Sequence, residues 1–587
     1  MCLVHILSIS GDGENETNML KPKLFSIIKN RKVELTKKSI MNDIIAGIIV
    51  AIIALPLSVA LAIASGVSPE KGLITAIIGG FLISFLGGSR VQIGGPTGAF
   101  VIIIYGIVAK FGIEGLTIAT MMAGIFMVFF GLMKFGSVIK FIPYPITTGF
   151  TSGIAVVLFS TQIKDFLGLS IEHVPSEFLE KWQVYLSNIS TTQFTTLAVG
   201  LASLLIIILW PKINKTIPGS LVALLVVTLA VKVFHIPVAT IGSVFGKISN
   251  KITLINIGDL NINLTIIKEL ITPAITIAFL ASVESLLSAV VADGMIGKKH
   301  NSNMELIAQG IANIACSLFG GIPATGAIAR TAANVKNGGR TPIAGIVHAL
   351  TLLLIMLVFM PLAQLIPMTT LSAILIIVAY NMSEWHAFKG LLKSTKSDVT
   401  VLLVTFSFTV LFDLVVAIEI GMVFAMFLFV KRMSESTKIE DSSLNYKAIY
   451  EDAENENEES DFAEIDNLRE HLGSKVFLYE INGPLFFGAA TAFIDVMKEI
   501  NSRSSIIILR MKDVPNMDAT ALSALKTIDK SCRDKHILIL YSEVNAQPMK
   551  LLKSTGFISN IGEDRFFKST LSAIKTANGI INYKALL

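Results

Sequence analysis

The sequence predicts an all-α polytopic membrane domain followed by a small α/β domain outside the membrane. Hydrophobic residues make up 53% of the 587 residues and charged residues only 16%, whereas about a quarter of the residues are charged in an ordinary soluble protein. Uncharged stretches long enough to cross a bilayer recur through the first three quarters of the chain. The last quarter instead alternates short, apolar, β-rich runs with helical patterns, which is typical of an α/β domain. The predicted strands lie at 475–481, 505–511 and 536–541, and the predicted helices at 491–501, 520–533 and 547–554.

Composition also excludes several classes of protein. The three cysteines, Cys2, Cys316 and Cys532, have neither metal-site nor disulfide-framework spacing. A net charge of +5 is expected of a membrane protein with basic cytoplasmic loops, so we predict no nucleic-acid partner. The sequence contains no P-loop, no G-x-S-x-G elbow and no H-E-x-x-H motif, and we predict that the protein is not an enzyme.

The membrane spans can be counted from the apolar stretches. The first covers 26 uncharged residues at 44–69, more than the roughly 20 needed to cross a bilayer. Two later segments, beginning at Gly94 and Gly321, are apolar but interrupted by glycine and proline. With these two, the predicted spans number fourteen, and the other eleven lie at residues 72–87, 115–133, 146–160, 193–210, 217–231, 271–291, 303–319, 342–367, 370–380, 399–412 and 414–430.

An even number of spans places both termini on one side of the membrane. The basic N-terminal segment, together with Lys431 and Arg432 after the last span, identifies that side as the cytoplasm of an inner or plasma membrane. The predicted divisions are a cytoplasmic segment at 1–40, a transmembrane transport domain at 41–432, an acidic linker at 433–473 and a cytoplasmic α/β domain at 474–587.

The two interrupted segments resemble each other. Residues 95–99 read GPTGA and residues 322–327 read IPATGA, so Gly326 follows Gly98 by 228 residues. Short broken segments in corresponding places of two halves point to a transport site built from discontinuous helices of an inverted repeat. The alternative is close packing of helices through small residues.

Helix ends supply the expected chemistry of such a site. A helix that begins within the bilayer has unpaired N–H groups and a partial positive charge, so two such ends form an anion cradle. Arg330 lies in the second broken segment and adds a fixed positive charge, unless it only snorkels or pairs with a carboxylate. Phe100, directly after Ala99, is expected either to line this site or to pack.

One carboxylate stands out in the membrane spans. Glu284 lies midway along the uncharged stretch 271–292, and Ser288 follows one helical turn later on the same face. Such oxygens couple transport to a proton or to sodium, or they satisfy N–H groups of a neighbouring half-helix. We predict a coupling group of Glu284, Ser288 and Gly326, no cofactor, and no metal except sodium at Glu284 and Ser288.

Four motifs together resemble the sulfate permease (SulP) family of anion transporters: Leu55-Pro56, GGPTGA, VESLLSAVVAD at 283–293 and ATGAIART ending at Thr331. The resemblance implies fourteen segments in two inverted sevens, in which a core domain (segments 1 to 4 and 8 to 11) moves against a gate domain in an elevator mechanism. It also implies a homodimer. The anion site that it implies comprises Thr97, Gly98, Ala99, Gly326, Ala327, Ile328 and Arg330.

The C-terminal part resembles a STAS domain, related to anti-sigma-factor antagonists. Asp518-Ala519-Thr520 matches the loop that carries a phosphorylated hydroxyl in soluble relatives, which makes Thr520 the equivalent residue and Asp518 its neighbour in a regulatory site. A cytoplasmic protein partner would bind through this domain.

Differences from the family pattern bear on the substrate. Leu57 stands where sulfate transporters usually have Gln, which resembles the bicarbonate branch. That branch has Asp at the position of Glu284 and Thr near Ile328, so this chain lacks both the shorter acid and one expected hydroxyl of a sodium site. Proton coupling is therefore at least as plausible as sodium coupling. We predict a secondary active transporter of bicarbonate or sulfate. The alternatives are an anion exchanger or channel for chloride or dicarboxylates, and a nucleobase permease of the same architecture.

Overall fold

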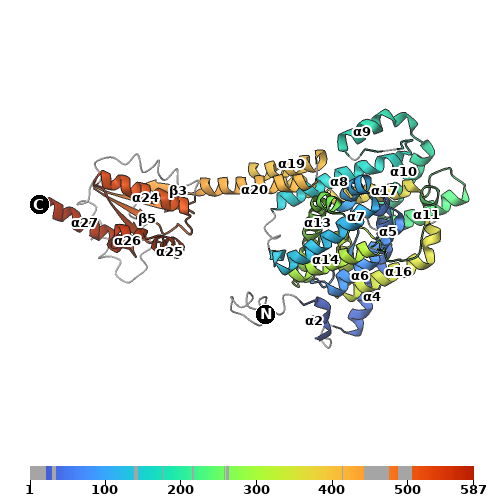
Figure 1. Cartoon of the computed structure of the whole chain (residues 1–587), viewed down its shortest axis with the longest axis horizontal. Helices are drawn as coiled ribbons and strands as arrows, with labels where there is room; N and C mark the ends of the chain where they lie inside the picture. Colours follow the sequence, from blue (N-terminus) through green and yellow to red (C-terminus); the bar gives the residue numbers. More distant parts are fainter. Residues whose placement is uncertain are drawn as a thin grey trace. The chain divides into compact units, whose positions relative to one another are not determined.

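The structure is a computed structural model that describes residues 21–29, 35–137, 143–172, 174–175, 177–214, 217–246, 248–256, 258, 263–412, 414–441, 475–486 and 505–586. The chain forms two compact units, Met1–Val423 and Phe424–Leu587, and the division falls within helix α20 (Leu414–Ser436). Figure 1 shows a helical N-terminal unit and a C-terminal unit that contains a β-sheet.

The N-terminal unit is a bundle of apolar helices. In the described part of the chain, seven helices or continuous helical segments are long and apolar enough to cross a membrane: Lys37–Ala64, Pro69–Leu86, Gly98–Leu132, Tyr144–Leu167, Phe194–Ile213, Leu264–Ile296 and Ile343–Ala363. The main helices are α4 (Lys37–Ala64), α5 (Pro69–Ile74), α6 (Gly80–Leu86), α7 (Val101–Leu132), α8 (Tyr144–Leu167), α10 (Phe194–Ile213), α11 (Gly219–Val233), α13 (Leu264–Ile296), α14 (Ser302–Leu318), α15 (Ile328–Lys336), α16 (Ile343–Ala363), α17 (Met368–Met382) and α19 (Lys396–Leu411).

Each of the fourteen predicted spans overlaps helical structure, although the two interrupted segments begin with residues outside helices and the last span lies on α20, which is divided between the two units. α5 and α6 form one span through the π-helical turn η1 (Thr75–Gly79). α7 covers two predicted spans, because Gly112 interrupts it with φ 67° and ψ −170°, a backbone conformation open mainly to glycine. Shorter helices outside the predicted spans are α2 (Lys23–Lys29), α9 (Phe178–Ser187), α12 (Ile241–Phe245) and α18 (Trp385–Leu391).

Local sequence signals start and pack these helices. The side chains of Thr36, Asn263 and Asn301 cap the first N–H groups of α4, α13 and α14. Glycine then allows α7 and α14 to approach closely, because a Cβ atom on Gly124 would lie 2.6 Å from the carbonyl oxygen of Gly310. Such close approach through small residues is how membrane helices gain packing contacts without a hydrophobic driving force.

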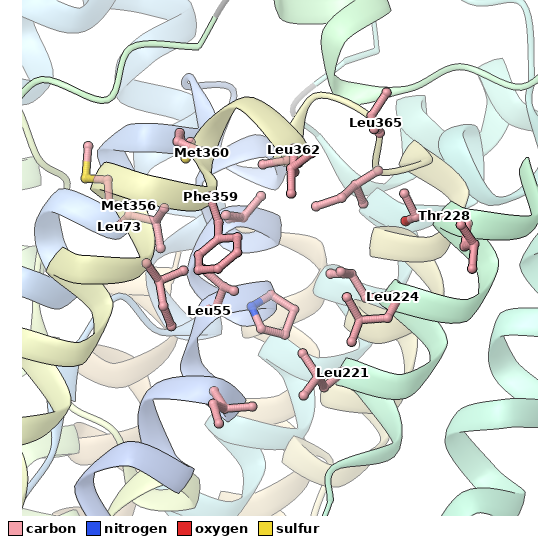
Figure 2. Close-up of a pocket in the computed structure, with 18 of the residues that line it drawn as sticks. Leu55, Leu73, Leu221, Leu224, Thr228, Met356, Phe359, Met360, Leu362 and Leu365 are labelled. Atoms are coloured by element: carbon pink, nitrogen blue, oxygen red, sulfur yellow. The ribbon is translucent and has the colours of Figure 1, made fainter. Parts of the chain in front are cut away.

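An apolar cavity of about 470 Å³ opens between α4, α11 and α16. Figure 2 shows leucine, methionine and phenylalanine side chains that enter it from these helices.

The C-terminal unit contains a five-stranded sheet in the order β3 (Lys438–Asp441), β4 (Val476–Asn482), β5 (Ile506–Arg510), β6 (Leu538–Ser542), β7 (Phe566–Phe567). β3 is antiparallel to β4, and the other neighbours are parallel. Every residue of β5 is buried, as expected of a central strand covered on both faces. Its helices are α24 (Ala519–Asp534), α25 (Ala546–Ser554), α26 (Phe557–Ile561) and α27 (Thr570–Leu586).

Alternate residues of β5 enter two separate apolar clusters. Ile507 and Leu509 pack with α24 and α26, while Ile506 and Ile508 pack with α27. The α/β pattern predicted from the sequence is therefore confirmed for 475–481, 505–511, 520–533, 536–541 and 547–554. The helix predicted at 491–501 and most of the acidic linker lie outside the described residues.

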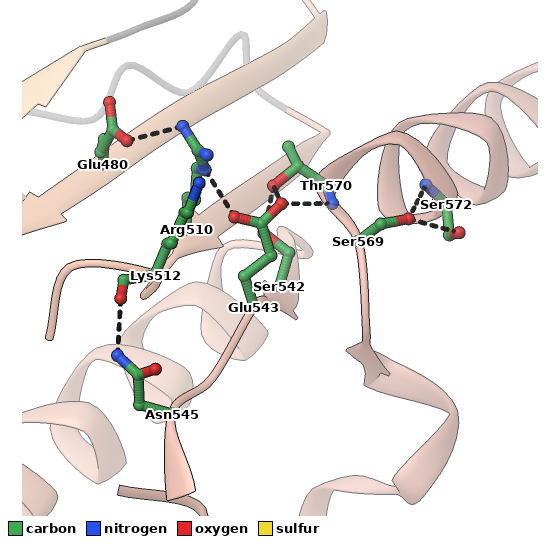
Figure 3. Close-up of polar contacts among 9 residues, drawn as sticks. All are labelled: Glu480, Arg510, Lys512, Ser542, Glu543, Asn545, Ser569, Thr570 and Ser572. Carbon is green, nitrogen blue, oxygen red and sulfur yellow. Dashed lines mark hydrogen bonds and ion pairs between the residues drawn. The ribbon is translucent and has the colours of Figure 1, made fainter. Parts of the chain in front are cut away.

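Buried charges hold the carboxyl ends of these strands together (Figure 3). Arg510, at the end of β5, donates to Oε1 of Glu480 on β4 and to Oε2 of Glu543 after β6, each at 2.8 Å. Oε1 of Glu543 accepts from the backbone N and the hydroxyl of Thr570 at the start of α27. Burial alone would raise the pKa of Glu543, but the hydrogen bonds from Arg510 and Thr570 outweigh it and hold that pKa below its usual value.

Candidate functional site

Two very short strands join the halves of the membrane unit. β1 (Gly94–Gly95) pairs antiparallel with β2 (Thr325–Gly326), so that Gly94 is opposite Gly326. Each strand leads within a few residues into a helix: β1 into η2 (Gly98–Phe100), which continues as α7, and β2 into α15. Both predicted interrupted segments are therefore broken before their helices begin. The first N–H groups of η2 and α15, which lack acceptors within the helix, lie on either side of one strand pair.

Arg330 connects the two interrupted segments. It lies in the first turn of α15, is 3% exposed, and its Nη2 donates to the carbonyl oxygen of Pro96, just after β1. Its Nη1 is buried and has no hydrogen-bond partner among the described residues. A Cβ atom on Gly95 would overlap Nη1, so glycine is needed there for the guanidinium to approach. A buried guanidinium with a free donor is costly unless an acceptor reaches it.

Glu284 approaches the same place from α13. Its Oε2 accepts a 2.8 Å hydrogen bond from the hydroxyl of Thr97, the residue directly before η2. The Pro96 carbonyl that accepts from Arg330 directly precedes Thr97 in the chain. A positive and a negative side chain therefore flank the start of the first broken helix.

Ser288, by contrast, contacts the second broken segment. It is buried, and its hydroxyl donates to Oγ1 of Thr331 on α15 at 3.2 Å. The same Oγ1 accepts from the backbone N of Ile93, before β1. Glu284 and Ser288 thus lie on one face of α13 but contact different broken segments. Within the described residues, no cluster of three or more His, Cys, Asp or Glu side chains could hold a metal ion.

Several site residues were missed by the sequence reasoning. Gln92 donates to the backbone oxygen of Ser285 at 3.1 Å and covers the face of Gly326, and Thr325 donates to the backbone oxygen of Ala281 at 3.0 Å. These two hydrogen bonds hold the β1 and β2 segments against α13. Only the position of Thr325 beside the repeated glycine could have indicated this role.

His348 was also missed. It lies on α16, is fully buried, and neither ring nitrogen has a hydrogen-bond partner in the part of the chain that is described. A Cβ atom on Gly80 would lie 3.6 Å from its Nδ1 and 3.1 Å from the carbonyl oxygen of Gly94, so the imidazole lies behind β1. Together with Nη1 of Arg330, it leaves unpartnered polar atoms around the strand pair, and buried polar atoms normally have partners.

The remaining predicted residues lie at the two helix starts. Gly98 faces α8 and α17, since its Cβ would lie 3.1 Å from Leu158 and 2.8 Å from Met382. Phe100 is fully buried in the apolar cluster that packs α7 against α13. Ala99, Gly326, Ala327 and Ile328 complete the predicted set at the starts of η2 and α15.

Comparison with known proteins decides the family. Residues 40–405 match the sulfate permease family, and residues 461–573 match the STAS domain. The chain belongs to the sulfate permease family. Like other members, it is a multi-pass membrane transporter for small inorganic anions and not an enzyme.

Two relatives align with nearly the whole of this chain. It is 40% identical over 528 residues to the putative sulfate transporter YvdB of Bacillus subtilis (strain 168), covering 90% of this chain and 96% of the relative. It is 31% identical over 558 residues to the bicarbonate transporter BicA of Picosynechococcus sp., covering 92% and 95%.

Solved structures agree with the fold of this sulfate permease family member. The transmembrane domain of a cyanobacterial bicarbonate transporter BicA matches with 28% identity and a TM-score of 0.58, covering 67% of this chain and 98% of that one. Murine Slc26a9 in the inward-facing state matches with a TM-score of 0.83 over 98% and 96% of the two chains. The identity to Slc26a9 is 17%, so that likeness concerns the fold alone. The predicted fold class, a helical membrane domain with a C-terminal STAS domain, is thereby confirmed.

In the STAS domain of this transporter, the two predicted regulatory residues begin α24. Oδ1 of Asp518 accepts from the backbone N of Ala521 at 2.8 Å and caps the helix. Thr520 is exposed in the first turn of the same helix. The hydroxyl is thus accessible next to N–H groups that favour a negative charge.

Proposed function

We propose that this protein is a secondary active transporter of bicarbonate or sulfate that binds its anion between the starts of η2 and α15. The observation that carries the proposal is Arg330: its buried guanidinium reaches across from α15 to Pro96 and keeps Nη1 unpartnered. An oxyanion there would accept from Nη1 and from the first N–H groups of both helices. The relatives named as sulfate and bicarbonate transporters support oxyanions as the substrate class.

Glu284 is proposed as the coupling group, and the proton as the coupling ion in preference to sodium. Ser288, the second oxygen considered for a sodium site, donates to Thr331. Glu284 instead accepts from the hydroxyl of Thr97, one residue before the helix start. Gain or loss of a proton at Glu284 would therefore change the charge next to the proposed anion site directly.

An elevator motion is supported by how hydrogen bonds group the helices. One group, the core domain, consists of α4 to α7 and α13 to α16. Its two halves are linked by bonds of Thr75 to Ile322, of Lys71 to Gly320, and of Asp43 to Thr341.

The other group, the gate domain, consists of α8, α10, α11, α17, α19 and α20. Ser152 donates to Ser383 between α8 and the end of α17, and Ser203 pairs with Thr370 between α10 and α17. At the boundary, Gly98 meets Met382 and Leu158 through apolar contacts, which can slide without breaking hydrogen bonds. We propose that the core domain moves as one body, in a homodimer whose termini are cytoplasmic, and that a cytoplasmic protein partner binds the STAS domain.

The test of the site is uptake into proteoliposomes by Arg330→Ala. Hydrogen bonds to charged groups contribute about 1.5–3 kcal/mol, so the variant should raise the KM for the anion by roughly 10- to 150-fold. Lys336→Ala is the matched control, because Lys336 is an exposed cation on the same helix. Unchanged uptake of every anion by Arg330→Ala would disprove the role of Arg330.

A flux panel identifies the substrate and the driving ion together. Labelled bicarbonate, sulfate, chloride and fumarate are compared with and without sodium, and at two pH values. Glu284→Gln should abolish accumulation against a gradient but leave downhill flux. Wild-type protein that never accumulates any anion would be a channel, and flux that requires a second anion on the opposite side would identify an exchanger.

A further inference from the structure

The apolar cavity of about 470 Å³ lies away from the proposed anion site. Figure 2 shows its walls: Leu55 from α4, Leu221 and Leu224 from α11, and Met356 and Phe359 from α16. By volume it could hold about fifteen water molecules at about 30 Å³ each, but a cavity lined almost entirely by carbon has too few polar partners to keep them. It is therefore suited to an apolar occupant.

One wall of the cavity changes character along its length. α11 contributes one helical face, from Leu221 through Leu224 and Thr228 to Lys232. The hydroxyl of Thr228 is buried and has no hydrogen-bond partner among the described residues. Lys232 is exposed in the last turn of α11, which ends at Val233. From Leu221 to Lys232 the helix rises about 16 Å, so the cavity is apolar at one end and cationic at the other.

No acidic residue lies close to Lys232 in the sequence. The stretch from Lys181 to Gly258, which includes α11, contains no Asp or Glu. An anionic group at this end of the cavity would therefore meet the positive charge of Lys232 and no acidic residue of this stretch.

We propose that the cavity binds an acyl chain of an anionic phospholipid. The chain would lie along α11 against Leu55 and Met356, with the phosphate at Lys232 and an ester or glycerol oxygen at the hydroxyl of Thr228. Lipid can enter from the side, because Leu225 and Leu229 line the cavity and are 58% and 64% exposed on the outer surface of the bundle. The amphipathic shape of the cavity thus matches a lipid better than a uniformly apolar ligand.

This position gives the lipid a mechanical role, which rests on the proposed function. The cavity is bounded by α4 and α16 of the core domain and by α11 of the gate domain. A bound chain would contact both bodies and change the rate at which one slides past the other.

The test measures lipid binding to the purified full-length protein in detergent by native mass spectrometry. Phosphatidylglycerol should bind about fivefold more tightly than phosphatidylcholine with the same chains, which corresponds to about 1 kcal/mol for one cation near an anionic headgroup. Lys232→Gln should remove this preference. Leu225→Trp should weaken binding of both lipids, because the larger ring fills the cavity from a position that is exposed and hence tolerant. Lys212→Gln, which removes a lysine that does not line the cavity, should bind both lipids like the wild type.

Two outcomes would overturn the proposal: a preference for phosphatidylglycerol that survives Lys232→Gln, or a Leu225→Trp protein that is folded and still binds both lipids as the wild type does. Uptake into vesicles of either lipid forms a separate arm. If the wild type transports nothing in that arm while the binding pattern holds, the proposed function fails and the lipid site stands.

Discussion

The hydrogen bond between Thr97 and Glu284 gives the sharpest prediction about transport. Thr97→Val keeps the shape of the side chain but removes the hydroxyl that donates to Oε2 of Glu284 at 2.8 Å. A hydrogen bond to a charged group contributes about 1.5–3 kcal/mol, equivalent to about 10- to 150-fold in an equilibrium constant. We expect uptake at subsaturating anion to fall by at least about tenfold.

The assay is initial uptake of labelled anion into proteoliposomes as a function of anion concentration and external pH. Thr97→Ser restores the donor and should remain within about threefold of the wild type, since a serine can make the same bond. Thr120→Val is the matched control on the helix that Thr97 precedes: Thr120 is also buried, but its hydroxyl donates to the backbone of its own helix, at Leu116. The reasoning is refuted if Thr97→Val and Thr120→Val transport equally well.

Three further perturbations follow from the same structure. Gly95→Ala should reduce uptake by more than about tenfold and stability by about 1–3 kcal/mol, because the new methyl group displaces Arg330 from a close-packed position; Gly106→Ala, with no atom within 4 Å of its Cβ, should behave as the wild type in the same assay. Asp43→Asn should reduce the free energy of unfolding by about 1–3 kcal/mol and so lower the melting temperature, since the buried Asp43 carboxylate accepts from two backbone N–H groups and a hydroxyl. The pKa of Glu543 is lowered in the folded state, so its contribution to stability is present above the unfolded-state pKa and lost as the pH falls through the folded-state pKa; hydrogen exchange of β6 amides in the full chain should show this acid dependence, and Glu543→Gln should flatten it.

The positions of the helices could be predicted because the bilayer imposes a length and a composition on each span. Even the two interrupted segments could be predicted, since glycine and proline mark the places where a membrane helix is broken. The central strands of the STAS domain were equally accessible, because buried parallel strands read as continuous apolar runs such as residues 506–510.

The register of the internal repeat could not be read from the letters. The similar motifs place Gly98 and Gly326 at a spacing of 228 residues. The structure pairs Gly94 with Gly326 and Gly95 with Thr325. The repeated letters show that the two segments are alike, but they do not say which residues lie opposite each other across an antiparallel ladder, where each strand residue has one partner.

Side-chain partners were the least predictable part of the candidate site. Spacing placed Glu284 and Ser288 on one helical face but could not assign either one to a broken segment. His348 gave no signal at all, because a single histidine in an apolar span is read as packing until the fold brings it behind Gly94. These contacts depend on how distant segments approach each other, which local periodicity does not encode.

The role of α13 follows from the alternation of contacts along one of its faces. The backbone oxygen of Ala281 accepts from Thr325 and the hydroxyl of Ser288 donates to Thr331, both in the second broken segment, while Glu284 accepts from Thr97 in the first. Because the bonds to the second half use a backbone oxygen and a hydroxyl, they keep their character when Glu284 gains or loses a proton. The bond to Thr97 does not, since its acceptor is the titrating carboxylate itself. Proton coupling, if it acts through Glu284, therefore enters the anion site asymmetrically, by changing the start of the first broken helix while α15 stays anchored.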